Sequence, residues 1–118
     1  MQIGKAKFVL LNLIALIGLG CTPKVSESEA RKLVEGYRRS ENMQIVSLHK
    51  TDGLAEVENG ANYYTMEYKL EVVYPKGYES PGTSFKAGEV YKETGRIHCV
   101  RTENGWKVLD LRVWHVEK

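Results

Sequence analysis

Apolar and polar residues alternate strictly through the middle of the chain. Between residues 62 and 74 every second residue is apolar, and most of the residues between them are polar or charged. Because successive side chains of a strand point to opposite faces, this pattern predicts a long, half-buried strand. Its apolar face carries Tyr64, Met66, Tyr68, Leu70, Val72 and Tyr74. The predicted sheet therefore needs a cover on one side.

A helical pattern precedes this strand. Ser26 and Glu29 have the spacing of a capping box, which marks a helix start. Charged residues after them, such as Arg31 and Arg38, are predicted to face water, and Asn42 is predicted to end the helix. The apolar residues between them form one stripe at helical spacing: Ala30, Leu33, Val34 and Tyr37. This stripe is the predicted cover of the sheet.

Turn signals divide the remainder into strands. Asp52-Gly53, Asn59-Gly60 and Asn104-Gly105 favour hairpin turns, because Asx and glycine tolerate a positive φ. The predicted strands span residues 44–50, 54–58, 62–74, 89–102 and 106–116. Residues 75–88, with two prolines and three glycines, are predicted to form a surface loop that is either functional or disordered. The predicted fold class is α+β, with one amino-terminal amphipathic helix packed on a curved antiparallel meander of four to five strands.

The last hairpin allows a prediction of register. Counting back from Asn104-Gly105 pairs Cys99 with Asp110. The apolar residues that follow the turn change from one face to the other, so a bulge is predicted within residues 107–110.

The first 21 residues have the order of an export signal. Residues 1–7 contain two lysines and no acidic residue, and the twelve residues that follow are apolar apart from Asn12. This run is shorter than the roughly 20 residues of a membrane-spanning helix. It ends in Gly18-Leu19-Gly20-Cys21, which resembles the lipobox of bacterial lipoproteins. The resemblance implies removal of residues 1–20 and acylation of Cys21 with lipid chains such as palmitate.

The same resemblance implies an organisation and a location. Residues 1–20 are the expected signal peptide, residues 21–25 a lipidated tether, and residues 26–118 a single α+β domain. Several acyl chains, at about 0.8 kcal/mol per buried methylene, hold a protein on a bilayer, whereas one chain holds it only marginally. The expected place is the cell membrane or outer membrane, facing the periplasm or exterior, with the lipid bilayer as a partner through acylated Cys21.

Charge and cysteine content narrow the expected partners. The predicted leader contains two of the 17 basic residues, so the remainder has 15 basic and 15 acidic residues. A neutral domain lacks the basic surface of a nucleic-acid-binding protein, so no nucleic acid is predicted as a partner. Cys99 and the three histidines lack metal-site spacing, so no metal or cofactor is predicted. Cys99 is predicted to be a small buried hydrophobe, with an intermolecular disulfide as the alternative.

The domain also resembles two families of small α+β domains. One helix before a curved antiparallel sheet, and the ending Asn-Gly-Trp-Lys-Val at residues 104–108, are similar to cystatin-like and nuclear-transport-factor-2-like domains. The second resemblance implies a ligand pocket between helix and sheet, for which His98 and Asp110 are candidate residues. The chain has one predicted helix where that family usually has three, and it lacks the Gln-x-Val-x-Gly loop of cystatins.

The aromatic residues gather in the predicted sheet. Tyrosine suits half-buried strands, and tyrosine and tryptophan also dominate binding hot spots. The leading hypothesis is a membrane-anchored envelope lipoprotein that binds a protein or cell-wall partner and is not an enzyme. It requires an exposed aromatic patch. The alternative is a small-ligand-binding or enzymatic pocket of the nuclear-transport-factor-2-like type. The candidate binding residues are Tyr74, Tyr78, Phe85 and Trp114.

Overall fold

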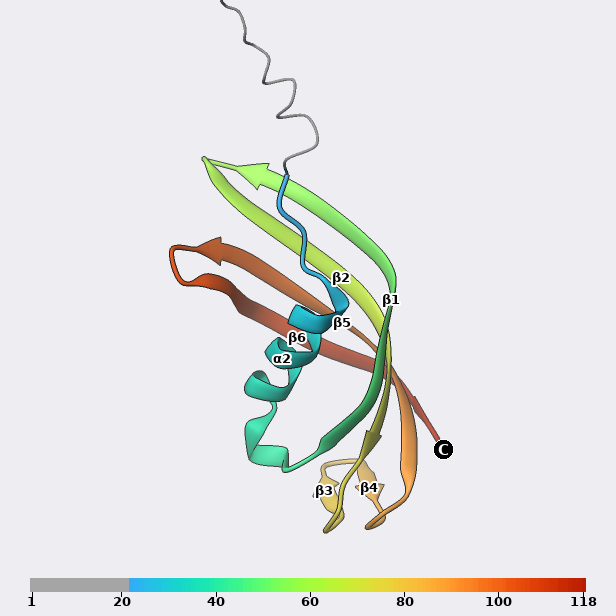
Figure 1. Ribbon diagram of the computed structural model, residues 1–118. Coiled ribbons are helices and arrows are strands. Elements are labelled where there is room, and N and C mark those ends of the chain that lie inside the picture. Colours follow the sequence, from blue (N-terminus) through green and yellow to red (C-terminus); the bar gives the residue numbers. More distant parts are fainter. Residues whose placement is uncertain (1–21) are drawn as a thin grey trace, which may run out of the picture.

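One helix lies in the hollow of a curved antiparallel sheet (Figure 1). The computed structural model describes residues 22–118. Helix α2 is followed by a short 3₁₀ turn, η1, and the four-stranded sheet has the order β1-β2-β5-β6, with a small β3-β4 hairpin at one end. The α+β class and the antiparallel sheet are confirmed. The elements span Glu27–Tyr37 (α2), Arg39–Glu41 (η1), Gln44–Glu58 (β1), Ala61–Val73 (β2), Tyr78–Ser80 (β3), Thr83–Phe85 (β4), Val90–Thr102 (β5) and Gly105–Glu117 (β6).

Helix α2 begins at the predicted capping box. The Glu29 backbone N–H donates to Ser26 Oγ at 3.1 Å, and the Ser26 backbone N–H donates to Glu29 Oε1 at 3.1 Å. The helix ends at Tyr37, earlier than predicted. Asn42, which has a left-handed φ of 54°, closes η1 instead.

The buried stripe of α2 is narrower than predicted. Ala30 and Val34 are buried and Leu33 is half-buried, whereas Tyr37 is 53 % exposed. The prediction is wrong for Tyr37 because the helix ends there and the chain turns away into η1. Val25, which is 1 % exposed, contributes to the core from before the helix. The packed part of the chain therefore begins within the predicted tether.

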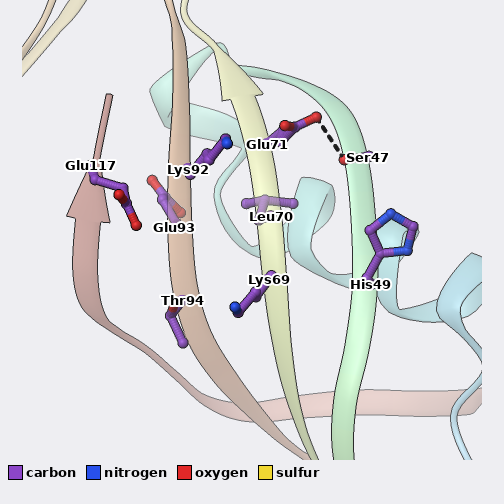
Figure 2. A pocket seen from close by; sticks show the side chains of 9 residues that line it. All are labelled: Ser47, His49, Lys69, Leu70, Glu71, Lys92, Glu93, Thr94 and Glu117. Carbon is purple, nitrogen blue, oxygen red and sulfur yellow. Dashed lines mark hydrogen bonds between the residues drawn. The ribbon is translucent and has the colours of Figure 1, made fainter.

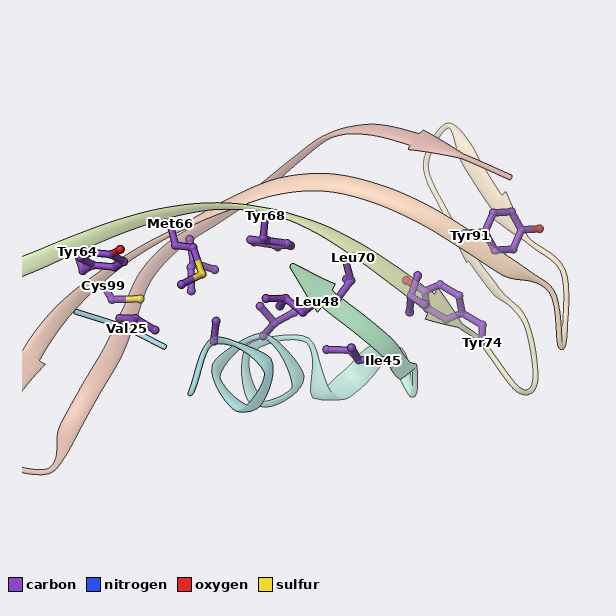
Figure 3. Packing of buried hydrophobic residues seen from close by; sticks show 14 of the residues in the cluster. Val25, Ile45, Leu48, Tyr64, Met66, Tyr68, Leu70, Tyr74, Tyr91 and Cys99 are labelled. Atoms are coloured by element: carbon purple, nitrogen blue, oxygen red, sulfur yellow. The ribbon is translucent and has the colours of Figure 1, made fainter. Parts of the chain in front are cut away.

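The predicted apolar face of β2 forms the sheet side of the hydrophobic core. Its six side chains are almost completely buried, and those of Met66, Tyr68 and Leu70 point from the sheet toward α2 (Figure 3). Ile97 and Cys99 of β5 extend the same face, opposite Met66 and Tyr64. Cys99 is a free, buried thiol, which agrees with the packing role predicted for it. The alternation in the sequence therefore identified the buried side of the central strand.

Strand β1 is continuous where two strands were predicted. Asp52-Gly53 does not turn the chain but lies within the strand, opposite residues 66–67 of β2. Register shifts near Val46 and Thr51 bend β1 there. A Cβ at Gly53 would lie 2.0 Å from the hydroxyl oxygen of Tyr64, so the glycine allows a close approach in the bent strand.

Two further turns were predicted from Asn-Gly pairs. Asn59 and Gly60 have φ values of 51° and 81°, which confirms the two-residue turn between β1 and β2. In the β5–β6 turn, Glu103 and Asn104 are the loop residues, and Gly105 opens β6 with a φ of 104°. The predicted register is wrong there because Gly105 belongs to the strand and not to the turn.

The β5–β6 ladder contains the predicted bulge. Cys99 pairs with Val108 and His98 with Asp110, so Leu109 is the extra residue. The predicted pairing of Cys99 with Asp110 is therefore corrected. A second register shift leaves Trp114 as an extra residue further along β6.

Gly95 allows a close contact between β5 and its neighbours in the sheet. A Cβ added there would lie 2.7 Å from the backbone oxygen of Arg112 and 2.9 Å from the hydroxyl oxygen of Tyr68. The Tyr68 ring reaches across β5 at this point, next to the bulge at Trp114. Glycine within a strand commonly marks such a bend.

We expect Gly95→Ala to lower the free energy of unfolding by about 1–3 kcal/mol, because the methyl group overpacks the Tyr68 contact. Urea unfolding followed by circular dichroism measures the change. Gly36→Ala is the matched control, since nothing lies within 4 Å of its Cβ position, and we expect it to add about 0.5–1 kcal/mol. A Gly95→Ala protein as stable as the unmodified one would contradict this interpretation.

Candidate binding cleft

A charged cluster is buried where α2 ends. The guanidinium of Arg38, 7 % exposed, donates from Nη1 to Glu93 Oε1 at 2.6 Å and from Nη2 to Glu93 Oε2 at 3.1 Å. It also donates from Nε and Nη2 to the two carboxylate oxygens of Glu41, at 3.1 and 2.9 Å. The Tyr74 hydroxyl accepts from Arg38 Nη2 and donates to Glu41 Oε1, both at 2.8 Å. One guanidinium thus joins the end of α2 to η1, β5 and the residue after β2.

The cluster is held in one protonation state. Burial lowers the pKa of Arg38, but the hydrogen bonds to Glu93 and Glu41 outweigh it and raise the pKa above its usual value. Burial raises the pKa of the Tyr74 hydroxyl, in spite of the opposing charge of Arg38. Near neutral pH the guanidinium is therefore charged and the phenol keeps its proton. Bidentate, charge-assisted bonds of this kind are stronger than neutral ones and fix orientation.

Sequence reasoning missed this cluster. Arg38 was predicted to lie on the solvated face of the helix, and that prediction is wrong. Because α2 ends at Tyr37, Arg38 takes a φ of −106° and a ψ of 24°, outside the helix, and its side chain reaches the sheet. The available signal was Glu93, a glutamate in phase with the buried Tyr91 and Ile97 of its strand. A carboxylate at such a position requires a partner.

The cluster forms one wall of a cleft of about 310 Å³. The β3-β4 hairpin forms a second wall with Tyr78 and Phe85, and strand β6 forms a third. The β6 wall is aliphatic and consists of Leu111, Val113 and Val116. Apolar walls with a few fixed polar groups are typical of binding sites.

Most of the predicted aromatic patch is buried. Tyr74 stacks on Tyr78 with ring centroids 5.3 Å apart and contacts Phe85 at 4.5 Å, and Phe85 meets Tyr91 edge-on at 4.8 Å. Tyr74 and Phe85 are buried, so the expected exposed patch is wrong for both. The reason is that residues 78–85, within the predicted loop, form the β3-β4 hairpin, and its rings pack on Tyr74 and on one another. Tyr78 is half-buried and lines the cleft.

Of the four candidate binding residues named from the sequence, Trp114 is the one that is largely exposed, at 52 %. It lies at a bulge of β6, an edge strand, and is not among the residues that line the cleft. The structure therefore does not bring the four predicted binding residues together on one surface.

His98 and Asp110 are neighbours across β5 and β6. His98 alternates with buried residues such as Ile97, so it points to the outer face of the sheet, away from α2. Its Nδ1 lies 2.8 Å from Thr65 Oγ1, and its ring stacks on Tyr63 with centroids 5.7 Å apart. The two candidates therefore do not line a pocket between helix and sheet.

A second hollow, of about 370 Å³, lies on the outer face of the sheet (Figure 2). Ser47 Oγ donates to Glu71 Oε1 across β1 and β2 at 3.1 Å. Lysine and glutamate alternate around this hollow, as is usual for the solvated face of a sheet. Its polar lining includes Ser47, His49, Lys69, Glu71, Lys92, Thr94 and Glu117. The cleft beside Arg38, with its apolar walls, is the better candidate site.

No family model, no curated protein and no solved structure matches this chain. Among residues 22–118, no helix has the length and apolar character needed to cross a membrane. In the same part of the chain, no three histidine, cysteine or carboxylate side chains are grouped so that they could hold a metal ion.

Arg38→Met leaves the carboxylates of Glu93 and Glu41 without their cation in a shielded site. We expect a loss of about 3–5 kcal/mol of unfolding free energy at neutral pH. The matched control is Arg112→Met, which breaks the exposed pair with Asp110 and should cost about 0–1 kcal/mol. Equal losses in the two variants would contradict the role of the buried cluster.

Alkaline conditions should also weaken the fold. Burial raises the pKa of the Cys99 thiol from 9.0 to about 11 and also raises the pKa of the Tyr68 hydroxyl. Above about pH 9 the unfolded chain therefore loses protons that the folded chain retains, and stability falls as the pH rises toward 11. Urea unfolding at several pH values measures this. In Cys99→Ala the decline should begin later, near the ordinary tyrosine pKa of 10.0. A stability that is constant across this range would contradict the prediction.

Proposed function

We propose that the protein is a membrane-anchored lipoprotein of the bacterial cell envelope and that its domain is a non-enzymatic binding module. The observation that carries the proposal is the lipobox-like run that ends in Cys21, immediately before the described domain. Cys21 itself lies outside the described residues. The buried Val25, only four residues later, supports a domain held close to its anchor.

The chemistry of the buried groups supports binding over catalysis. Every nitrogen of the Arg38 guanidinium bonds to Glu93, Glu41 or both, so the cluster is suited to hold shape and not to move a proton. Burial raises the pKa of the Cys99 thiol to about 11, which keeps it from acting as a nucleophile near neutral pH. His98, its neighbour in sequence, points to the opposite face of β5.

The cleft beside Arg38 is the proposed contact surface for a protein or cell-wall partner. The partner's apolar groups pack against the aliphatic wall of β6 and the ring of Tyr78, and the fixed cluster orients its polar groups. A small molecule is the second candidate ligand. The cleft volume of about 310 Å³ lies at the lower end of the usual range for small-molecule pockets, so a protein or cell-wall partner is the first candidate.

Cys21→Ala tests the anchor. Without the thiol no thioether to lipid forms, so the protein should move from the detergent-extractable membrane fraction to a soluble or precursor form. Fractionation followed by mass spectrometry of the amino terminus measures both changes. Cys99→Ala is the matched control and should remain in the membrane. Unchanged membrane partition of Cys21→Ala would refute the anchor.

The binding role is tested on the same membranes. Crosslinking and capture of the native lipoprotein should recover a partner, and Tyr78→Ala in the cleft should reduce that recovery. Lys69→Ala, on the outer face of the sheet, is the control and should leave the recovery of the partner unchanged. If nothing is captured above background, the proposed envelope partner has no support.

A further inference from the structure

We infer that the domain stands on the membrane with the β1–β2 and β5–β6 turns in the lipid headgroup layer, and with the cleft beside Arg38 facing away from the lipid. This inference rests on the proposed lipid anchor at Cys21. It identifies a lipid surface as the partner of one end of the sheet. The other end is left free for the cleft.

The point at which the chain leaves the domain is fixed by Val25. Its side chain is buried beside Tyr64 of β2 and Cys99 of β5 (Figure 3). Thr22 and Lys24 before it are exposed. Only four peptide links therefore join Cys21 to a residue that is held in the core.

The direction of this exit is visible in the ribbon. The segment before α2, drawn in blue, runs toward the end of the sheet that carries the β1–β2 and β5–β6 turns (Figure 1). The β3-β4 hairpin lies at the opposite end. Because that hairpin supplies a wall of the cleft, the cleft also lies away from the exit.

Two lengths then decide how closely the domain approaches the lipid. The four links from Val25 to Cys21 span at most about 14 Å when fully extended. From Tyr64, at the level of Val25, β2 continues for four residues to the turn at Gly60, which is about 13 Å at the rise of a strand. The turns protrude about as far as the tether can reach. A Cys21 whose acyl chains enter the bilayer therefore brings the turns to the headgroups.

The side chains near the turns suit this layer. Val57 is 64 % exposed near the β1–β2 turn. Near the β5–β6 turn, the guanidinium of Arg101 lies 5.5 Å from the ring centroid of Trp106. Trp106 packs against the core with its Nε1 buried, so the exposed Arg101 is the member of this pair that can reach the headgroups. The charges at this end have both signs, with Glu58 and Lys107 among them, so the contact is imposed by the short tether and not by a net charge.

The experiment measures how close each end of the domain lies to the lipid. The lipidated protein is reconstituted into vesicles of phosphatidylethanolamine and phosphatidylglycerol that contain headgroup-spin-labelled phosphatidylcholine. A thiol-reactive fluorophore is placed by Glu58→Cys, Glu103→Cys or Ser84→Cys, three exposed positions, while the buried Cys99 is left in place. We expect strong loss of fluorescence at residues 58 and 103. At residue 84, in β4, we expect no loss beyond that of the free dye.

The controls separate the possible failures. A protein that does not float with the vesicles lacks the anchor, and the proposed function fails with it. A protein that floats but is quenched at residue 84 as strongly as at residues 58 and 103 has the anchor and overturns the orientation. A flexible Gly-Ser insert of about ten residues between Thr22 and Pro23 lengthens the tether and should abolish the quenching at both turns. Quenching that persists with this insert would show that the short tether does not impose the contact.

Discussion

The guanidinium of Arg38 is the contact on which the arrangement of helix and sheet depends. It is shared by two carboxylates and a phenol from three other segments. Removing such charges from water is costly, and the cost is offset only when both carboxylates are bonded in good geometry. The cluster therefore tolerates few alternative positions of η1, β2 and β5. It also places one wall of the cleft, so the shape of the candidate site follows from the same contact.

The curvature of the sheet is the second constraint, and it has a consequence for the edges. Strands of 13 to 15 residues cannot wrap a single short helix unless they bend. Each edge strand, β1 and β6, has two register shifts, and Gly95 allows the Tyr68 ring to cross β5. Bulges at an edge interrupt the row of free backbone groups and disfavour pairing with another chain. The bends that curve the sheet around α2 thus also protect the edge strands β1 and β6 from pairing with another chain.

Burial of Val25 connects the fold to the proposed function. Because this residue belongs to the core, the tether is shorter than the pattern of residues indicated, and one end of the sheet is tied to the proposed anchor. The cleft at the other end, with the fixed cluster and the aliphatic wall of β6, is then the surface presented to the surroundings. In the proposed arrangement, attachment and recognition lie at opposite ends of the sheet.

Local features could be predicted from the sequence because they depend on residues that are near each other in the chain. These are the helix start at Ser26, the buried face of β2, the Asn59-Gly60 turn and the bulge at Leu109. The candidate site could not, because Arg38 and Glu93 are 55 positions apart and no local pattern pairs them. Asp52-Gly53 shows the same limit: the dipeptide suits both a turn and a bend, and pairing with β2 decides between them. The sequence by itself determined where α2 begins and which face of β2 is apolar. Only the tertiary structure decided which charges are buried and where the cleft lies, since burial depends on contacts between distant segments.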